Sequence, residues 1–319
     1  MPKVSVIIPV YGVEKYIERC ARSLFEQTLD DIEFIFIDDC TPDNSIGVLK
    51  EVINDYQHRV SQIIIERMPQ NSGLPRVRKK GVDLATGDYI IACDSDDYVE
   101  KEMYKTMLDE AVNNQLDLVQ CDIDVVDDSH VINTFTSPEA ELTSGRLKEL
   151  IIQGEISNSL CNKLVKKEVY HCEHITFPTV GMDEDNALAI QLAFFCDKLG
   201  YVRKPFYKAY CNRLSISRAG GIAKVQKQFN ESLENSKLII GFLSSHGYNE
   251  NSMAVIRAKV RPKQIIWRFI KNRKAFDLWI KTYPEINYKV LLHPGFSLKT
   301  RFKFFITLFI IKPFKFILK

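Results

Sequence analysis

The chain has 319 residues, which is enough for one large or two ordinary domains with a sizeable core. Apolar residues make up 45% and charged residues 26%, a balance typical of a globular protein and unlike that of a disordered or collagen-like chain. The net charge of +2 excludes a protein that binds polyanions over its whole surface, so any basic patch has to be local.

The eight cysteines are scattered along the chain and show no paired C-x-x-C spacing, so they do not indicate a zinc site. No signal-peptide pattern stands before the first apolar run. Together these features lead us to expect a protein of the reducing cytoplasm.

The first part of the chain alternates apolar runs with amphipathic stretches. Val4–Val10 is a continuous, mostly β-branched run, as expected of a strand buried on both faces, and 16–27 carries apolar residues at helical spacing. A second strand is predicted at 32–37, and turn residues from Thr41 lead into a second helix around Leu49. These segments form two consecutive strand–helix units.

The same alternation continues. A third strand is predicted at 60–65, followed by a polar loop at 71–75 and a basic helix that ends near Gly87. Strand, helix and strand are then expected at 89–93, 100–113 and Leu118–Val126. This order predicts an α/β fold, a Rossmann-like and mostly parallel sheet with helices on both faces.

Beyond residue 127 the pattern loosens. Helices are predicted at Ser144–Gln153, 185–196 and 225–246, and the chain after Met253 is basic, aromatic and helical in character. We therefore expect an α/β domain over 1–219 and a helical C-terminal region over 220–319.

Acidic residues follow two of the predicted strands. They are, in chain order, Asp38, Asp39, Asp94, Asp96 and Asp97. On its own, an acidic pair after a strand more often forms a solvated turn or a helix cap, and Asp97 is expected mainly to cap the next helix. Ligands of open α/β sheets bind at the carboxyl ends of the strands, however, so all five carboxylates are expected on one rim. Such clustering is costly without a cation, and Mg²⁺ and Mn²⁺ prefer oxygen ligands.

Four short segments carry a resemblance to a known family. They read VSVIIPVY from Val4, FIDDCT from Phe36, NSGLPRVR from Asn71 and DSDD from Asp94. In this order they resemble the inverting family 2 glycosyltransferases of the GT-A fold, of the type that builds bacterial polysaccharide or lipopolysaccharide. Further landmarks at 161–164, 177–178, 184–185 and 213–217 extend the resemblance over roughly residues 3–217.

The resemblance implies a set of residues that bind the nucleotide of the sugar donor. Pro9, Val10 and Tyr11 would line the nucleotide base, and Asp39 would accept a hydrogen bond from uracil. Ser95, in the DSDD segment, would belong to the same donor-binding set. The implied donor is a UDP-sugar.

The resemblance also implies a metal site and a catalytic base. Asp94 would lie near the ribose and the metal, and Asp96 would ligate an Mn²⁺ or Mg²⁺ ion on the diphosphate. Arg78 would place a positive charge on the donor side, and Asp185 would be the general base. An extra acid, Asp183, leaves open which carboxylate of the 183–185 run faces the acceptor.

The reaction implied is a single displacement with inversion, in which an acceptor hydroxyl attacks the anomeric carbon as the nucleoside diphosphate leaves. A hexose or N-acetylhexosamine would pass to a glycan or lipid-linked glycan, as in the synthesis of capsule or lipopolysaccharide. The segment 207–217 could close over the donor or be a plain surface loop. A nucleotide-sugar-binding protein without turnover and a nucleotidyltransferase remain alternatives, although the second lacks a glycine-rich, lysine-bearing phosphate loop.

Residues 299–319 combine lysine, arginine and phenylalanine and contain no acid. Two interpretations remain open, an interfacial helix on an anionic membrane and a terminal helix docked on the body with solvated lysines. The apolar stretch 304–311 is far shorter than the ~20 residues that span a bilayer. We expect weak association with the inner face of the plasma membrane, and no nucleic-acid partner, because no recognised binding module accompanies the charge.

Overall fold

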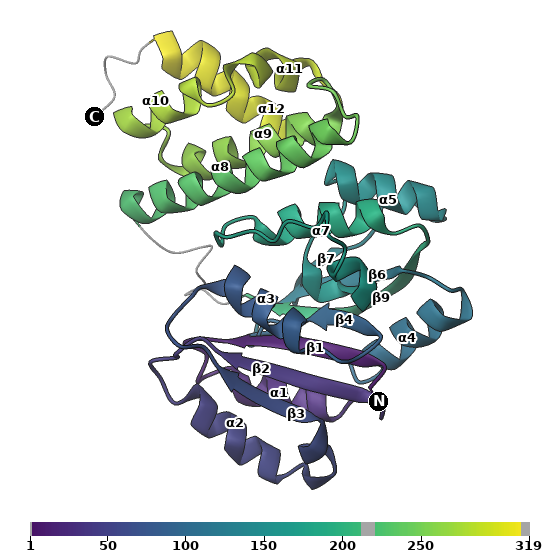
Figure 1. Ribbon diagram of the computed structural model, residues 1–319. Helices are drawn as coiled ribbons and strands as arrows, with labels where there is room; N and C mark the ends of the chain where they lie inside the picture. The colour runs from purple at the N-terminus through teal and green to yellow at the C-terminus, as the bar shows by residue number, and fades with distance from the viewer. Residues whose placement is uncertain (1, 212–220, 314–319) are drawn as a thin grey trace. The chain divides into compact units, whose positions relative to one another are not determined.

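The computed structural model describes residues 2–211 and 221–313 (Figure 1). The chain divides into two compact units, which we call the α/β unit (Met1–Thr179 with Leu188–Ser215) and the helical unit (Val180–Ala187 with Ile216–Lys319). The predicted domain boundary between 219 and 220 lies outside the described residues.

The α/β unit contains a nine-stranded sheet, and four of its strands form the parallel half that the sequence predicts. These strands lie side by side in the order β3 (Ile63–Arg67), β2 (Ile32–Asp38), β1 (Val4–Val10) and β4 (Tyr89–Ala92). Every residue of β2 and nearly every residue of β1 is buried, so both faces of this half are covered. The continuous apolar runs are the direct cause.

The other half of the sheet is mixed, which differs from the expected mostly parallel arrangement. The order continues from β4 through β8 (Lys163–Lys166), β6 (Leu118–Val126), β9 (Leu199–Tyr210) and β5 (Tyr98–Val99), and β7 (Val131–Phe135) pairs with β6. Only β6 and β9 pair in parallel here. The sequence did not indicate β5, β7, β8 or β9 because these strands are short or partly exposed, and β7 is exposed throughout.

The helices of the α/β unit are close to those predicted. They are α1 (Ile17–Phe25), α2 (Ser45–Asn54), α3 (Leu74–Leu84), α4 (Met103–Asn113), α5 (Ser144–Gln153) and α6 (Lys167–Tyr170), with α7 (Glu184–Phe195) shared between the units. A short 3₁₀-helix, η2 (Leu160–Asn162), precedes β8.

The predicted third strand began too early. Residues Gln57–Gln62 form the 3₁₀-helix η1, and the strand starts only at Ile63. Within η1 the buried guanidinium of Arg59 donates hydrogen bonds to the main-chain oxygens of Phe25 and Leu29. These contacts hold η1 against the end of α1. The strand therefore begins after η1 and not at residue 60.

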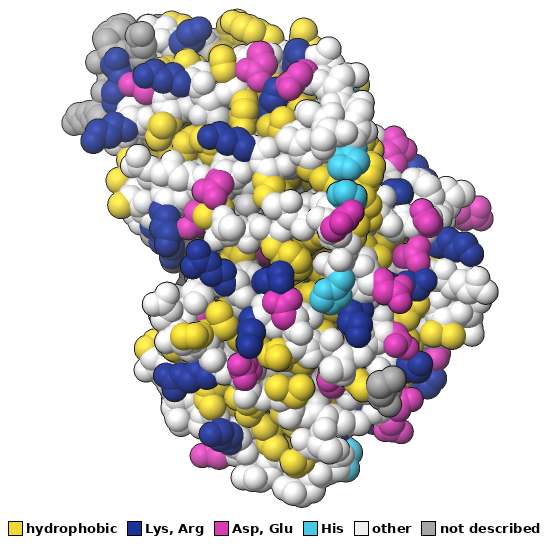
Figure 2. All heavy atoms as spheres, in the orientation of Figure 1, with side chains coloured by type: hydrophobic (Ala, Val, Ile, Leu, Met, Phe, Trp, Pro, Cys, Tyr) yellow, Lys and Arg dark blue, Asp and Glu magenta, His cyan; other side chains and the backbone are white. Residues whose placement is uncertain are grey.

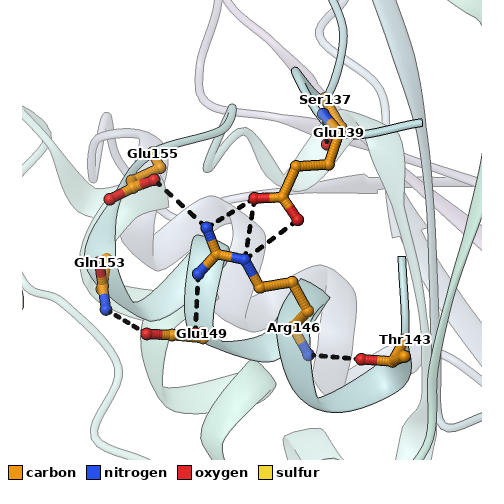
Figure 3. A network of polar contacts seen from close by, with 7 residues as sticks. All are labelled: Ser137, Glu139, Thr143, Arg146, Glu149, Gln153 and Glu155. Carbon is orange, nitrogen blue, oxygen red and sulfur yellow. Dashed lines mark hydrogen bonds and ion pairs between the residues drawn. The ribbon is translucent and has the colours of Figure 1, made fainter. Parts of the chain in front are cut away.

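A polar network on the surface fixes the segment before α5 (Figure 3). Arg146 donates to both carboxylate oxygens of Glu139 and to Glu149, and its guanidinium lies 3.9 Å from Glu155. The Thr143 side chain caps the helix by accepting the main-chain N–H of Arg146. Because the Arg146 side chain is one-third exposed, we assign the network a local structural role.

The helical unit has its own core. Its helices are α8 (Ile222–Ser245), α9 (Met253–Ile266), α10 (Arg273–Lys281), α11 (Asn287–Leu292) and α12 (Leu298–Phe305), with the short helices η3 (Trp267–Phe269) and η4 (Pro284–Ile286) and the π-helical turn η5 (Ile306–Ile311). Trp279, Phe229 and Phe304 are among its most deeply buried side chains. Across the described part of the chain, no helix has both the length and the apolar character needed to cross a membrane.

Candidate active site

Three parallel strands of the α/β unit end at one edge of the sheet. Strand β1 lies between β2 and β4, with Val10 paired to Asp38 and Ile7 paired to Ala92. The residues that follow these strands include Tyr11 and Asp39, and the DSDD segment begins two residues after β4. Asp38 is the last residue of β2, and the other four acids predicted for the rim follow β2 or β4 at this edge.

The acids do not gather into one cluster. Among the described residues, no three carboxylate, histidine or cysteine side chains come close enough to form a ready-made metal site. Strand β1 separates the end of β2 from the end of β4. The side chains of Asp39 and Asp97 are also held by hydrogen bonds to the main chain.

The first segment presents one exposed aromatic ring. Val10 is fully buried, whereas Tyr11 is 47% exposed. The main-chain oxygen of Pro9 accepts a hydrogen bond from the Ser95 hydroxyl at 2.6 Å, which ties the end of β1 to the DSDD segment. Of the three residues expected to line a nucleotide base, Tyr11 thus offers the most accessible side chain.

Asp39 organises the loop that precedes α3. Its two carboxylate oxygens accept the main-chain N–H groups of Ser72 at 2.6 Å and Gly73 at 2.9 Å. Gly73 has a φ of +81°, a conformation that residues with a side chain rarely adopt. Each carboxylate oxygen can accept more than one hydrogen bond, so the contact with uracil stays a prediction.

Arg78 and Asp94 form an ion pair. The buried Arg78, on α3, donates from Nη2 to Oδ1 of Asp94 at 2.7 Å, and the Asp94 side chain is 37% exposed. Such charge-assisted hydrogen bonds are among the stronger polar contacts. The guanidinium offsets the negative charge of the DSDD segment.

Asp97 does not cap the next helix, so that prediction is wrong. Its Oδ2 accepts the Tyr207 hydroxyl at 2.6 Å, and its Oδ1 accepts the main-chain N–H of Tyr210 at 2.7 Å. The chain enters β5 after the DSDD segment and α4 begins only at Met103, so Asp97 lies against β9 instead. Burial raises the pKa of Asp97 well above its usual value, and the other two acids of the segment raise it further.

Two supporting residues escaped the sequence analysis. Tyr207 is buried, and besides donating to Asp97 its oxygen accepts the main-chain N–H of Asp94 at 3.1 Å. Arg19, on α1, donates to the main-chain oxygen of Asp96 and lies 4.1 Å from the centre of the Tyr210 ring. The signal was missing because β9 was not predicted and these partners are far apart in the chain.

Replacing Tyr207 by Phe is expected to lower turnover as well as stability. The change leaves Oδ2 of the buried Asp97 carboxylate without its donor, at a cost of about 1–3 kcal/mol, and loosens the segment that carries Asp94 and Asp96. Thermal unfolding and kcat would be measured together.

Tyr201 on the same strand provides the matched control. Its hydroxyl accepts the N–H of Ser137 and donates to buried Asp122, the same pair of contacts as at Tyr207. Tyr201→Phe should lose similar stability and keep its kcat. Equal kcat values for the two variants would show that Tyr207 is only structural.

The three acids at 183–185 differ in their surroundings. Asp183 has a φ of +65° and a side chain 4% exposed, and its carboxylate accepts hydrogen bonds from Arg261 at 2.6 Å and from the Ser232 hydroxyl. Glu184 is buried, whereas Asp185 is half-buried in the first turn of α7. Asp183 thus anchors this segment to α8 and α9, and Asp185 is partly accessible.

Part of the expected second-half pattern cannot be placed. The landmark at 213–217 and most of the expected lid at 207–217 lie outside the described residues. Tyr207–Tyr210 form the end of β9.

The chain matches proteins of one family over much of its length. The family model described as "Glycosyl transferase family 2" matches residues 5–173. The putative glycosyltransferase EpsH of Bacillus subtilis is 29% identical over 242 residues, which cover 72% of this chain and 66% of EpsH. EpsH and two further glycosyltransferase relatives are matched by this chain over only 34% to 66% of their own length.

Solved structures share the fold. Residues 1–349 of TarS from S. aureus, in complex with UDP-GlcNAc, align with a TM-score of 0.61 at 18% identity, over 96% of this chain and 90% of that one. The mannosyltransferase PcManGT from Pyrobaculum calidifontis, in complex with GDP-Man and Mn²⁺, aligns with a TM-score of 0.58 at 12% identity, over 98% and 87%. The expected GT-A type of α/β fold is confirmed, and the chain belongs to the family 2 glycosyltransferases.

Proposed function

We propose that the chain transfers a hexose or N-acetylhexosamine from a UDP-sugar to a hydroxyl of a glycan or lipid-linked glycan in cell-surface polysaccharide synthesis. The observation that carries the proposal is the edge where β1, β2 and β4 end. In a chain of this family it presents the exposed ring of Tyr11, the loop held by Asp39 and the ion pair of Arg78 with Asp94. The fold shared with TarS, solved with UDP-GlcNAc, supports a UDP-sugar as the donor.

The acids of the DSDD segment suit Mn²⁺ or Mg²⁺. Asp94 and Asp96 offer carboxylate oxygens, the ligands that these ions prefer, and both side chains are partly accessible. Because Asp94 and Asp96 form no three-ligand cluster with another acid, histidine or cysteine among the described residues, the diphosphate and water would complete the coordination. A bound ion would offset the charge of the leaving diphosphate. The Mn²⁺ in the PcManGT structure supports this part of the proposal.

We assign the general base to Asp185. An alcohol is a weak nucleophile at neutral pH, and a positioned carboxylate that takes its proton contributes ~10²–10⁴ in rate. Asp183 is held by Arg261 and Ser232 and Glu184 is buried, so accessibility favours Asp185 over both. Attack from the face opposite the leaving diphosphate inverts the anomeric centre.

The proposal includes a place in the cell. A lipid-linked acceptor would be met at the inner face of the plasma membrane, and the proposed location is the cytoplasm with peripheral attachment to that face. The basic and apolar character of the C-terminal helices supports attachment.

A donor screen tests the function. UDP release is expected from one or a few UDP-sugars, stimulated by acceptor and lost when EDTA removes the divalent cation. Donor binding without any release would indicate a nucleotide-sugar-binding protein without turnover. Formation of pyrophosphate from a nucleoside triphosphate and a sugar phosphate would indicate a nucleotidyltransferase.

A further inference from the structure

One side of the helical unit exposes large apolar side chains. We call them the α11–α12 surface, and each is between 45% and 81% exposed: Tyr288, Leu292, Leu298, Phe302, Phe305, Phe309 and Ile310. They come from α11, α12 and η5, which follow one another along the chain. Exposed apolar side chains gathered in this way mark an interaction surface.

Five of these side chains form one continuous surface: Leu298, Phe302, Phe305, Phe309 and Tyr288. A hollow between α11 and α12 is lined by Leu291, Leu298, Lys299, Arg301, Phe302 and Phe305. The Phe305 and Phe309 rings lie 5.1 Å apart, and the Phe309 and Tyr288 rings 6.4 Å apart. Arg301 Nε donates to the main-chain oxygen of Leu291 at 2.8 Å and so joins α12 to α11.

The terminal helix has two apolar faces. Phe304 and Leu308 point into the core, where the Phe304 ring packs 4.8 Å from Trp279. The outer stripe recurs at i, i+4, i+7 and i+11, that is at Leu298, Phe302, Phe305 and Phe309. The two interpretations of the tail therefore apply to different faces, because one face is docked and the other remains apolar and exposed.

The chain segment that carries this surface has charge of one sign. Residues 287–319 contain no acid, and their bases within the described part are Lys289, Lys299, Arg301, Lys303 and Lys312. Burial lowers the pKa of Lys303, and the positive charges of Lys299 and Arg268 lower it further. Figure 2 shows hydrophobic and basic side chains over the helical unit, with a few acidic ones among them.

The nearest acids in the chain have partners already. Glu285, the last acid of the sequence, and Glu250 both pair with Lys259, and Asp277 pairs with Arg273. The positive charge of the surface is therefore not offset by carboxylates of its own segment. An anionic partner is what such a surface favours.

We propose that the α11–α12 surface is the face by which the protein lies on an anionic lipid bilayer. The phenylalanine and leucine side chains would enter the boundary between headgroups and acyl chains, with the basic side chains at the phosphates. A second copy of this chain fits less well, because a two-fold contact through this surface would bring like charges together. The inference rests on the proposed peripheral attachment and names the surface responsible.

Vesicle sedimentation tests the proposal with the full chain. We expect binding to vesicles of phosphatidylglycerol and phosphatidylcholine, little binding to phosphatidylcholine alone, and loss of binding at high salt. The double variant Phe302→Ser with Phe309→Ser should weaken binding by about tenfold or more, since two large side chains no longer enter the bilayer. Phe135→Ser, which alters a ring 50% exposed on β7, is the matched control and should bind as the wild type does.

A charge pair of variants separates the electrostatic part. Lys299→Glu with Lys312→Glu should weaken binding to the anionic vesicles, whereas Lys50→Glu, at an exposed site on α2, should not. Unchanged binding of the phenylalanine variant, or equal binding to neutral vesicles, would overturn the proposal. The proposal would also be overturned if sedimentation velocity showed a dimer that the same substitutions dissociate, and if the protein bound no vesicles.

The experiment is independent of glycosyl transfer. Vesicle binding needs neither donor nor metal, and UDP release with a water-soluble acceptor should be the same in the phenylalanine variant and the wild type. Lost vesicle binding with normal release would therefore concern the surface alone. Vesicle binding without any release would contradict the proposed function and leave the surface assigned.

Discussion

Replacing Asp185 by Asn is expected to lower kcat for sugar transfer by ~10²–10⁴ while the Kd for the UDP-sugar stays unchanged. The amide has nearly the same size as the carboxylate but cannot take the proton of the acceptor hydroxyl. In the proposed function the donor is bound by residues at the ends of β1, β2 and β4, so its binding should not depend on this proton acceptor. Transfer rates at saturating donor, and donor binding by calorimetry, would measure the two effects separately.

An acid just after the same helix offers a control for this variant. Asp197 lies just beyond the C-terminal end of α7 and is exposed, so Asp197→Asn should keep the wild-type kcat. Thermal unfolding of both variants would show that neither change disturbs the fold. Full activity in Asp185→Asn would remove Asp185 as the base, and attention would turn to the acids beside it.

The parallel half of the sheet could be predicted because its signals are local. Strands β1, β2 and β4 are runs of apolar residues, and buried parallel strands need such runs on both faces. The acids at the ends of these strands could be predicted as well, because they stand where each apolar run stops. Arg78 pairs with Asp94, and the roles that the family resemblance implies for the two residues stay a prediction.

The support of the DSDD segment could not be predicted in this way. Asp97 looked like a helix cap because an acid before a helical pattern is a common local signal. Its real partners, Tyr207 and Tyr210, lie 110 and 113 residues away on a strand that is only partly buried. Contacts of this kind depend on sheet order, which alternation of apolar residues does not specify.

The terminal helix shows a related limit. Its sequence contains enough phenylalanine for either a docked or a membrane-facing helix. Packing of Phe304 against Trp279 decides which stripe faces inward, and Trp279 belongs to α10. This contact leaves Phe302 and Phe309 on the outward stripe.

Replacing Asp96 by Asn is expected to lower turnover by about 10²-fold or more and to raise the Mn²⁺ concentration needed for half-maximal activity. A metal that offsets charge on the diphosphate contributes several kcal/mol, and loss of a ligand oxygen forfeits much of that contribution. The measurement is UDP release over a series of Mn²⁺ concentrations. Asp83→Asn, at an exposed acid on α3 paired with Lys79, should give the wild-type curve.

Asp94→Asn separates the two acids of the segment. It should raise the Mn²⁺ requirement as well, but it also removes the carboxylate that accepts from the buried Arg78, so the Tm should fall. Asp96→Asn leaves the ion pair of Arg78 with Asp94 in place, so its Tm should stay closer to the wild-type value. A wild-type Mn²⁺ dependence in Asp96→Asn would exclude Asp96 as a ligand, and an unchanged dependence in both variants would move the metal away from this segment.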